Sequence, residues 1–432
     1  MAGLRRPFLE GDEIKLTPSR LGKRGEAEGE YRGWRVRVEG GIPGEASRVR
    51  VLHVSKGGQV AAGRFLGPVD APHPSRREPV CPIHDRCGGC GLQQMRESGV
   101  LELKVDQARS ALGDRGSWST PIASPRAFEY RCKTFLLPQR RGTVLLLGAR
   151  PPRGERLVET RGCSVLRPEL EALAERARVV LEGELELEPR LRSLMLRCNR
   201  AGQVQLTLVH RDAGEGLESL VERIAPDAGF LQRHDAPGNR ICSDEEERLV
   251  VGRGPIEERF GDSLEIEIPP TAFLQGNPEV AEALYRAAAA ELEGERIGEL
   301  YCGGGAAGLL TLTDRPETHL HGVDRSPRAI AAAGRNADRN GLADRCHFET
   351  IAAESARGEW DSVLVNPPRA GCHADVVTAI AESRASKLVY LSCNAQTLAR
   401  DIDRLGWRLA TVQPADMFPQ TAHLELLATL IR

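Results

Sequence analysis

Short apolar segments alternate with amphipathic ones from about residue 256 onward, and this pattern restricts the possible folds more than any other feature of the chain. The apolar segments are RIGELYC, WDSVLVN and KLVYLSC, at residues 296–302, 360–366 and 387–393. Helices are expected between them, at 326–340 and 373–385. Apolar strands separated by helices are typical of a parallel sheet covered on both faces. We therefore predict an α/β, Rossmann-like domain for residues 256–432.

The rest of the chain is long enough for further domains. The 432 residues are about three times the ~150 expected for one domain. Residues 1–70 contain short alternating strands separated by glycines, which favour an OB-like antiparallel barrel. After a proline-rich linker, residues 71–255 mix strands with helices at 98–113 and 168–182, which predicts a central α+β domain.

The distribution of charge differs between the two parts of the chain. The first 255 residues are net basic and the remainder is net acidic. This split suits a polyanion that is bound by the first part while the second part performs chemistry, and chance fluctuation explains it equally well.

The sequence also bears on the compartment. It has no run of ~18 consecutive apolar residues, so we expect no membrane span. The segment MAGLRRPFLEGDEIK becomes charged before a hydrophobic region could form, unlike a secretory signal. We therefore expect a cytoplasmic, monomeric protein. In a reducing compartment, clustered cysteines among its eleven would bind metals or react rather than form disulfides.

Three cysteines lie close together, as Cys81, Cys87 and Cys90, and Cys163 is a candidate fourth ligand. Neighbouring thiolates repel one another unless a metal ion or an iron–sulfur cluster lies between them. The adjacent glycines would let backbone N–H groups approach cluster sulfides. We favour a 4Fe–4S cluster over structural zinc, because zinc sites prefer paired short spacings and Cys163 has no close cysteine neighbour. The third possibility is that these cysteines hold no metal.

A glycine-rich turn follows the first apolar strand of the α/β region. Gly303, Gly305 and Gly308 spell G-x-G-x-x-G, and Asp324 ends the next strand, HLHGVD. Such a turn lets backbone approach a cofactor at a helix N-terminus, and the carboxylate can accept ribose hydroxyls. The motif predicts a nucleoside cofactor without separating NAD from S-adenosylmethionine, and a turn without a ligand remains the alternative.

Two further motifs lie where strands end. Asn366-Pro367-Pro368 would terminate one strand at the edge where open sheets bind ligands. Cys393 follows another strand, and a partly exposed thiolate there could act as a nucleophile, although a buried structural thiol is the alternative. Glu425 is the nearby candidate acid or base in DMFPQTAHLELL.

In combination, these motifs resemble those of the RNA uracil-C5 methyltransferases that use S-adenosylmethionine. The similarity is greatest to the branch with an N-terminal TRAM domain and an iron–sulfur cluster, whose members modify 23S ribosomal RNA. It runs nearly end to end: GGIPGE, at 40–45, is similar to the TRAM signature, and Phe273-x-Gln275-x-Asn277 to the family's F-x-Q-x-N.

The resemblance implies a role for each matching residue. The expected ligands of the 4Fe–4S cluster are Cys81, Cys87, Cys90 and Cys163. The expected contacts of S-adenosylmethionine are Gln275, Tyr301, Gly303, Gly305, Asp324 and Asn366. Cys393 would be the nucleophile and Glu425 the general base. Three departures concern cofactor affinity: Asn366 replaces the usual aspartate, Ala306 replaces a polar residue, and FETIAAES offers no clear polar contact for adenine.

The implied reaction explains why these residue types are needed. Uracil carbon 5 is a poor nucleophile, so the Cys393 thiolate would first add to carbon 6, and Glu425 would later remove the proton from carbon 5. The expected partner is RNA, with 23S ribosomal RNA as the leading target and tRNA as the runner-up. A catalytically weak RNA-binding protein and an NAD-linked oxidoreductase are the remaining hypotheses.

Overall fold

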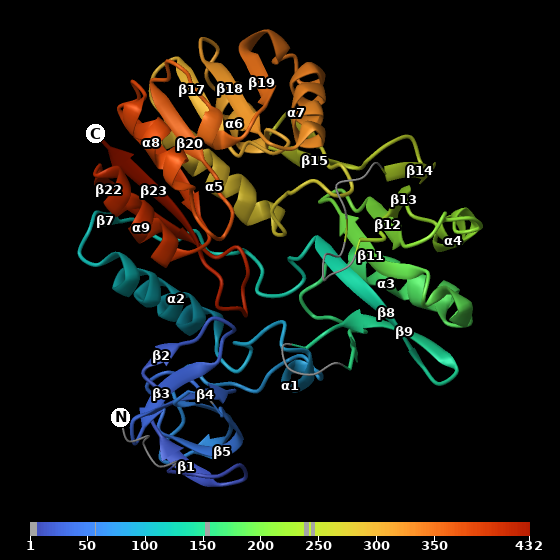
Figure 1. The fold of residues 1–432 in the computed structure, drawn as a ribbon, viewed down its shortest axis with the longest axis vertical. Helices are drawn as coiled ribbons and strands as arrows, with labels where there is room; N and C mark the ends of the chain where they lie inside the picture. Colours follow the sequence, from blue (N-terminus) through green and yellow to red (C-terminus); the bar gives the residue numbers. More distant parts are fainter. Residues whose placement is uncertain (1–6, 57, 152–155, 237–241, 243–246) are drawn as a thin grey trace. The chain divides into compact units, whose positions relative to one another are not determined.

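The computed structural model describes residues 7–56, 58–151, 156–236, 242 and 247–432. The chain forms two compact units. The N-terminal unit comprises Met1–Ser110, Pro151–Gly154 and Phe418–Leu424, and the main unit comprises Ala111–Arg150, Glu155–Met417 and Glu425–Arg432. Figure 1 shows the chain coloured along its sequence. No helix among the described residues is long and apolar enough to cross a membrane.

A six-stranded sheet forms most of the N-terminal unit. Its strands are β1 (Glu13–Leu16), β2 (Arg20–Leu21), β3 (Ala27–Tyr31), β4 (Trp34–Glu39), β5 (Ser47–Val54) and β6 (Val60–Pro68), in the order β1-β5-β6-β4-β3-β2. Alternation along β5 directs Val49 and Val51 into the core and leaves Arg48 and Arg50 exposed. The predicted β-rich region is therefore present, and it is not purely antiparallel, because β6 returns from β5 to pair in parallel with β4.

Two helices complete the described part of the N-terminal unit. The short α1 (His84–Cys87) lies within the cysteine segment. The longer α2 (Glu97–Leu112) agrees with the helix predicted at 98–113 and leads toward the main unit. Leu92, Met95 and Val100 are buried against Leu21 and Ile42, which ties the segment before α2 to the sheet.

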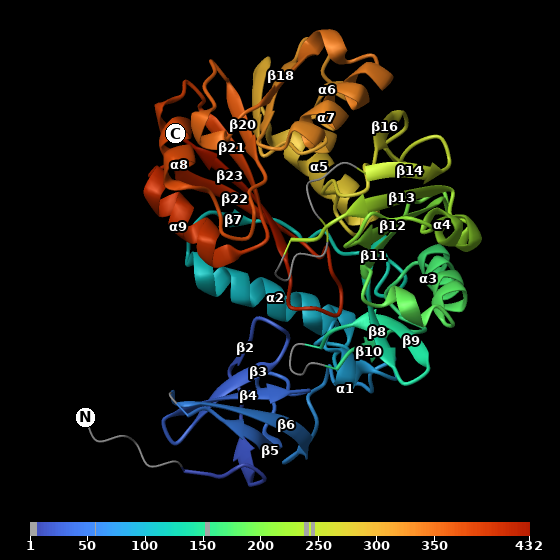
Figure 2. The ribbon, with the colours of Figure 1, turned by 45° about the vertical axis from the view of Figure 1, so that its right-hand side comes forward.

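A seven-stranded sheet forms the central part of the main unit. Its strands are β8 (Lys133–Arg141), β9 (Val144–Ala149), β10 (Val158–Glu159), β11 (Leu191–Cys198), β12 (Val204–His210), β13 (Ala228–Arg233) and β14 (Glu247–Val251), in the order β10-β9-β8-β11-β12-β13-β14. The helices are α3 (Pro168–Leu181), which matches the predicted helix at 168–182, and α4 (Glu218–Ile224). Both helices cover one face of this sheet (Figure 2), and their leucines form its core. A hairpin of β15 (Glu257–Phe260) and β16 (Leu264–Glu267) follows.

An eight-stranded sheet forms the rest of the main unit. Its strands are β7 (Ser117–Trp118), β17 (Arg296–Leu300), β18 (His319–Asp324), β19 (Cys346–Thr350), β20 (Ser362–Val365), β21 (Lys387–Ser392), β22 (Arg408–Ala415) and β23 (Glu425–Ile431). The order is β19-β18-β17-β20-β21-β23-β22-β7, in which β23 runs antiparallel to its two neighbours. Five helices accompany the sheet: α5 (Pro278–Glu291), α6 (Ala306–Thr313), α7 (Pro327–Arg339), α8 (Ala374–Glu382) and α9 (Ala395–Leu405).

The sheet covered on both faces that the sequence predicts is confirmed, and its ladders are parallel except for those of β23. Helices α5, α6 and α7 lie on one face and α8 and α9 on the other (Figure 2). The ladders of β17 with β18 and β20 are parallel, so their carboxyl ends meet at one edge of the sheet. The sequence did not reveal β7. Two residues are too few to show a periodicity, and β7 is held by its pairing with β22.

Candidate active site

The glycine turn after β17 has the backbone geometry that its sequence predicts. Gly303 and Gly305 adopt positive φ, and so does Tyr301 at φ 62°, an uncommon conformation for a tyrosine. Gly305 directly precedes α6. Gly308 is needed for packing, because a Cβ atom there would lie 2.2 Å from Oε2 of the buried Glu299 on β17. The turn therefore presents the amino end of α6 at the carboxyl edge of the sheet.

Asp324 lies at the end of β18 and faces this turn. Its carboxylate accepts hydrogen bonds from the backbone N–H of Gly303 at 3.1 Å and of Ser326 at 2.9 Å. A carboxylate has about four acceptor sites, so the two that remain could accept ribose hydroxyls. Asn336 on α7 donates to the carbonyl of Gly304 at 2.9 Å and fixes the turn from the other side.

The loop that contains Gln275 is held by the central sheet. The backbone N–H of Cys132 donates to the carbonyl of Gly276 at 2.9 Å, and the Cys132 thiol lies 3.7 Å from the carbonyl of Gln275. The guanidinium of Arg197 donates to the carbonyl of Ala272. Gln275 is itself buried, whereas Phe273, two residues earlier, is 65% exposed. The central sheet therefore fixes the backbone of this loop.

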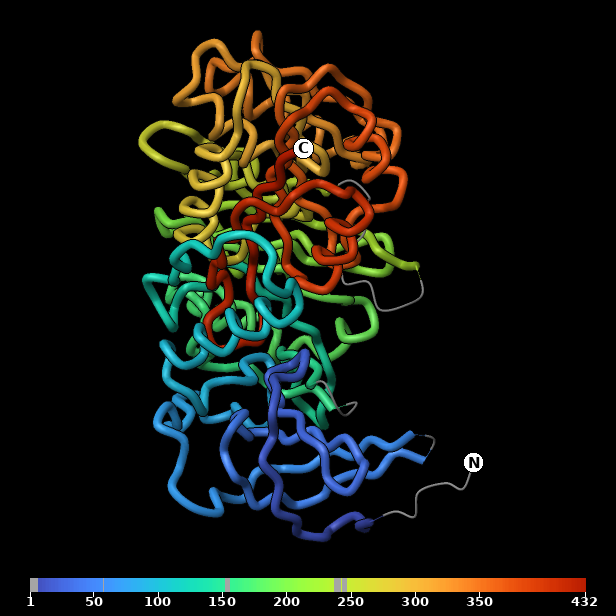
Figure 3. Tube along the Cα trace, turned by 90° about the vertical axis from the view of Figure 1, so that its left-hand side faces the viewer, coloured from blue at the N-terminus to red at the C-terminus, as the bar shows by residue number. Residues whose placement is uncertain are grey.

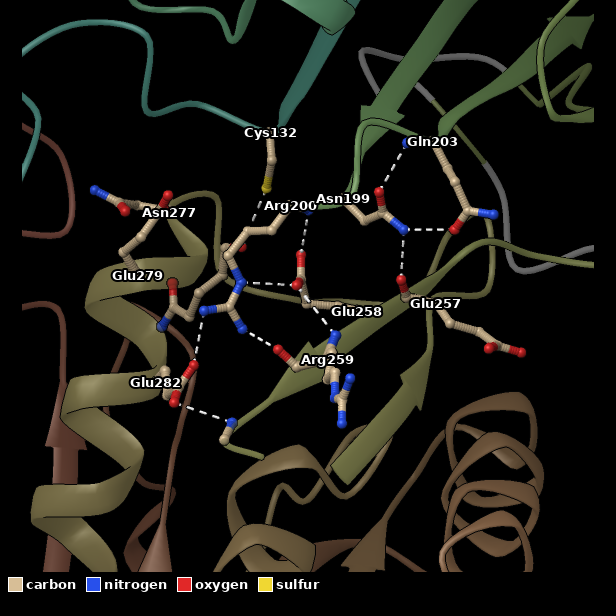
Figure 4. Close-up of polar contacts among 12 residues, drawn as sticks. Cys132, Asn199, Arg200, Gln203, Glu257, Glu258, Arg259, Asn277, Glu279 and Glu282 are labelled. Atoms are coloured by element: carbon tan, nitrogen blue, oxygen red, sulfur yellow. Dashed lines mark hydrogen bonds and ion pairs between the residues drawn. The ribbon is translucent and has the colours of Figure 1, made fainter. Parts of the chain in front are cut away.

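An arginine joins the same sheet to the α/β region. Arg200, at the turn after β11, donates to Glu258 at 2.8 Å and to Glu282 on α5 at 2.7 Å (Figure 4). Glu258 is only 2% exposed, so this ion pair is largely shielded from water. Asn277 caps α5, and its side chain also donates to Ser124 at 3.0 Å. These contacts connect both ends of the Gln275 loop to packed elements.

Cys393 and Glu425 lie at the same end of one strand pair. In the ladder between β21 and β23, Ser392 is opposite Leu426. Cys393 follows the first of these residues and Glu425 precedes the second, so the two predicted catalytic residues occupy the next facing position. Each influences the charge of its surroundings: the Glu425 carboxylate contributes to the raised pKa of Cys393.

Burial sets the protonation of both groups. It raises the pKa of the Cys393 thiol to about 11, with the Glu425 carboxylate adding to the rise and Arg369 opposing it. Burial likewise raises the pKa of the Glu425 carboxyl to about 7, and Arg369 again opposes the shift. Arg369 is exposed and follows the two prolines after β20. It is thus a cation close enough to both groups to favour their ionised forms.

The loop with Asn366 is fixed by the helix that follows Cys393. Asp401 on α9 is buried and accepts hydrogen bonds from the backbone N–H of Cys372 and the hydroxyl of Tyr390, both at 2.8 Å. Arg400 donates to the carbonyl of Ala370 at 2.8 Å. Asn366 itself extends β20 through a bond from its N–H to the carbonyl of Leu300. The turn that contains Cys393 and the proline loop after Asn366 are therefore connected by hydrogen bonds through α9.

The predicted metal ligands are divided between the two units. Cys81, Cys87 and Cys90 lie in the N-terminal unit, and Cys163 lies in the main unit, at the turn before α3. Within the cysteine segment, the Nε2 atom of His84 is buried and has no hydrogen-bond partner among the described residues, so a bound group there would satisfy it. Thiolate donors suit an iron–sulfur cluster.

A different group has ligand atoms that already converge. In the described part of the chain, those of His321, His347 and Glu349 lie within 4.8 Å of one another. The indole N–H of Trp360 donates to Nδ1 of His321 at 3.3 Å, and Glu349 lies 2.7 Å from Nε2. When Nδ1 of a neutral His321 ring accepts this bond, the ring proton lies on Nε2. The Nε2–H group then donates a hydrogen bond to the Glu349 carboxylate. The His321 ring is therefore satisfied without an ion.

A basic groove lies within the N-terminal unit. Its volume is about 640 Å³, and its lining includes the side chains of Arg24, Arg64, Arg76, Arg77 and Arg86 together with Phe65. The guanidinium of Arg76 lies 3.9 Å from the centre of the Phe65 ring and also pairs with the buried Glu45. Cationic and aromatic groups of this kind suit a polyanion that carries planar bases.

Sequence reasoning missed four residues of the site. Arg369 directly follows the motif Asn366-Pro367-Pro368 and could have been found as a cation beside the expected nucleophile. The other three contribute through contacts far apart in sequence, which no local pattern signals; they are Cys132, Arg197 and Asp401.

Two family models match the carboxyl-terminal part of the chain. The methyltransferase small domain matches residues 266–389, and the tRNA (uracil-5-)-methyltransferase model matches residues 355–432. The second range contains Asn366, Cys393 and Glu425. The family resemblance expected from the sequence is therefore confirmed for this region.

Curated relatives match the chain over nearly its whole length. An RNA methyltransferase of Gloeobacter violaceus is 33% identical, with 98% of this chain and 98% of the relative covered. One from Thermosynechococcus vestitus is also 33% identical, with 98% and 99% covered. Among solved structures, the Pyrococcus abyssi tRNA (uracil-54, C5)-methyltransferase in complex with S-adenosyl-L-homocysteine has a TM-score of 0.78 at 24% identity, with 97% of this chain and 100% of that chain covered. At this level of identity, the likeness concerns the fold.

Proposed function

This chain belongs to the RNA methyltransferase family, and we propose that it transfers a methyl group from S-adenosylmethionine to carbon 5 of a uridine in 23S ribosomal RNA. The observation that carries the proposal is the facing position of Cys393 and Glu425 at the carboxyl end of β21, with Arg369 close to both. A nucleophile, a carboxylate and a cation together are what addition to a pyrimidine requires.

S-adenosylmethionine would bind at the turn after β17 and supply the electrophilic methyl group. Asp324 would accept the ribose hydroxyls with its two remaining acceptor sites, and Gly303 and Gly305 would allow close approach of the backbone. Gln275 and Tyr301 would complete the pocket together with Asn366 at the end of β20. An amide at position 366 can both donate and accept a hydrogen bond, so the usual carboxylate is replaced without losing an acceptor.

The chain's own residues account for each step of the reaction. The Cys393 sulfur adds to carbon 6 of uracil, and the electron pair of the 5,6 double bond moves into an enolate, which Arg369 would stabilise. Carbon 5 then takes the methyl group, and S-adenosylhomocysteine is released. Glu425 removes the remaining proton from carbon 5, the double bond re-forms and the bond between sulfur and carbon 6 breaks.

RNA would reach this site as an unpaired strand. The reacting ring must leave its base stack before sulfur can approach carbon 6, so loops and single strands are favoured substrates. The basic groove of the N-terminal unit, with Phe65 and Arg76, would bind flanking nucleotides. This role agrees with the TRAM-like, OB-like character expected for residues 1–70.

A 4Fe–4S cluster is the group that we propose for Cys81, Cys87, Cys90 and Cys163. The orphaned Nε2 atom of His84 and the thiolate donors support it. A cluster bound through four thiolates would supply no open iron for chemistry, so these residues would stabilise the protein and shape an RNA-binding surface. We also propose the division into domains at 1–70, 71–255 and 256–432 that the sequence predicts, with the cluster in the central domain.

Transfer RNA is the second candidate substrate. Two observations favour it: the matching family model bears the name of a tRNA enzyme, and the solved structure with the same fold acts on uracil 54 of tRNA. The catalytic residues do not discriminate between the two RNAs, because the reaction at uracil is the same.

One experiment tests the chemistry and another tests the target. RNA containing 5-fluorouridine has no removable proton at carbon 5, so the wild-type protein should remain covalently attached to it after methyl transfer. Cys393→Ala should form no adduct, and an active protein that forms none would refute the mechanism. Mass mapping of 23S ribosomal RNA and tRNA from cells without this chain would identify the substrate by the missing 5-methyluridine.

A further inference from the structure

The chain leaves the main unit after Met417 and re-enters it at Glu425. Met417 and Glu425 belong to the main unit, whereas the segment between them, Phe418–Leu424, belongs to the N-terminal unit. Figure 3 shows this segment, in red, beside the teal helix α2. What holds Phe418–Leu424 therefore also fixes the chain immediately before the proposed base.

Gln420 is the residue by which this segment is held most firmly. It is fully buried and adopts φ 66°. Its side-chain amide donates to Glu97 at 3.2 Å and accepts from Arg77 at 3.2 Å, and Arg77 and Glu97 also pair with each other at 2.8 Å. Its carbonyl accepts from the backbone N–H of Leu92 at 3.0 Å. Arg77, Leu92 and Glu97, the partners in these hydrogen bonds, all belong to the N-terminal unit.

A buried lysine holds the beginning of the same segment. Lys104 is 2% exposed as a residue, and its ammonium donates to the carbonyl of Phe418 at 3.0 Å. Ala422 packs against Leu92, Met95 and Val100 further along the segment. Three separate contacts along seven residues leave this connection little freedom.

Glu425 needs a firm position because of the step that it performs. Proton removal from carbon 5 requires the carboxylate oxygen to lie within hydrogen-bond distance of that proton, and an error of about 1 Å can cost roughly a hundredfold in rate. On its carboxyl side Glu425 is fixed by the ladders of β23 with β21 and β22. On its amino side it is joined directly to the segment Phe418–Leu424, which belongs to the N-terminal unit.

We propose that Gln420 is a positioning residue that sets the approach of Glu425 to carbon 5, and that it acts on proton removal and not on the addition of Cys393. This inference rests on the proposed function of Glu425. Because Cys393 lies in the short turn between β21 and α9, its own connections stay within the main unit.

The test separates the two steps with RNA that contains ordinary uridine. For Gln420→Ala, we expect the covalent adduct to form within about twofold of the wild-type rate and to resolve roughly 10- to 100-fold more slowly. A methylated protein–RNA adduct should therefore accumulate on a denaturing gel. Amide hydrogen exchange of residues 418–424 should become faster in the same variant.

Two variants serve as controls. Gln107 is another glutamine of the N-terminal unit, and its amide donates to the carbonyl of Leu21 at 2.9 Å and not to the 418–424 segment. Gln107→Ala should lose this bond and keep both rates. Lys104→Met retains a long side chain but loses the bond to Phe418, so it should show the same slow adduct resolution as Gln420→Ala. It therefore tests the positioning role independently if Gln420→Ala folds poorly.

The possible outcomes are distinct. The positioning role would be overturned if Gln420→Ala and Lys104→Met slowed adduct formation and adduct resolution equally. It would also be overturned if neither variant changed either step. Glu425→Gln tests the underlying assignment separately: if it accumulates no methylated adduct, the proposed base is wrong, whatever the other variants do.

Discussion

Arg369 is the residue on which the reactivity of the site most depends. A thiol with a pKa of about 11 is almost entirely protonated at neutral pH, and Arg369 is the cation that opposes this shift. The same guanidinium opposes the raised pKa of Glu425. One exposed side chain thus favours the reactive form of both groups.

Replacing Arg369 by glutamine should slow adduct formation with 5-fluorouridine RNA roughly tenfold, because loss of the guanidinium raises the pKa of the Cys393 thiol further. The measurement is the single-turnover rate of adduct formation at several pH values. Arg384→Gln is a suitable control, because Arg384 is also exposed and pairs with Glu359 on the surface. Equal rates in wild type and Arg369→Gln would show that the guanidinium does not assist the thiolate.

The raised pKa of Glu425 predicts a pH profile for the last step. Only the carboxylate can accept the proton from carbon 5, so the rate of adduct resolution should rise with pH through about 7 and then level off. At pH 5 the rate should be roughly a hundredfold below the plateau. Release of methylated RNA from preformed adduct, followed between pH 5 and 9, measures this. A midpoint near the ordinary glutamate value of about 4.3 would contradict the buried environment.

At the scale of elements, the sequence predicted regular and repeated structure well. Helices at 326–340 and 373–385 correspond to α7 and α8, because both carry a clear apolar face. The glycine turn and the strand-end positions of Asn366 and Cys393 also agree with the structure. The parallel pairing of β4 with β6 depends on contacts distant in sequence, and so does the addition of β7 to the eight-stranded sheet. No local pattern indicates either of them.

The contact between β17 and α6 offers a test of the turn as an element. A methyl group at Gly308 would collide with Glu299 and with Leu320 on β18. Gly308→Ala should therefore destabilise the protein by roughly 1–3 kcal/mol and weaken S-adenosylhomocysteine binding, since α6 must move away from the strand. Thermal unfolding and calorimetry measure the two effects. Gly334→Ala on α7, where a Cβ meets nothing within 4 Å, is the control: it should leave S-adenosylhomocysteine binding unchanged and should not lower the stability, because alanine favours a helix more than glycine does.

At the scale of the whole molecule, the proposal assigns RNA binding to one unit and chemistry to the other. The net basic character of the first 255 residues agrees with this division. Composition alone could not place the groove, because its arginines come from a loop, from strand β6, from the segment that follows β6 and from α1. The assignment of 23S ribosomal RNA or tRNA could not be made from the catalytic residues either, since both substrates present the same base.

Replacement of a groove arginine should weaken binding to all RNAs and lower its dependence on salt. Arg64→Ala should reduce the slope of log K against log salt by about 1, as expected for the loss of one phosphate contact. Arg50→Ala is a matched control: its side chain is 53% exposed against 52% for Arg64, and it does not line the groove. Equal slopes for the two variants would show that the groove does not bind the RNA backbone.

The strand β23 has a paired neighbour on each side, and Glu425 is its first residue. Successive residues of a strand point to opposite faces, so a slip of one residue would replace the carboxylate by Leu424 or Leu426 and reverse every side chain after it. Single-residue insertions and deletions are often neutral in loops, yet within this stretch one would remove the proposed base while breaking two ladders at once. The proposed role of Glu425 therefore depends on the register of the strand as much as on the identity of its acid.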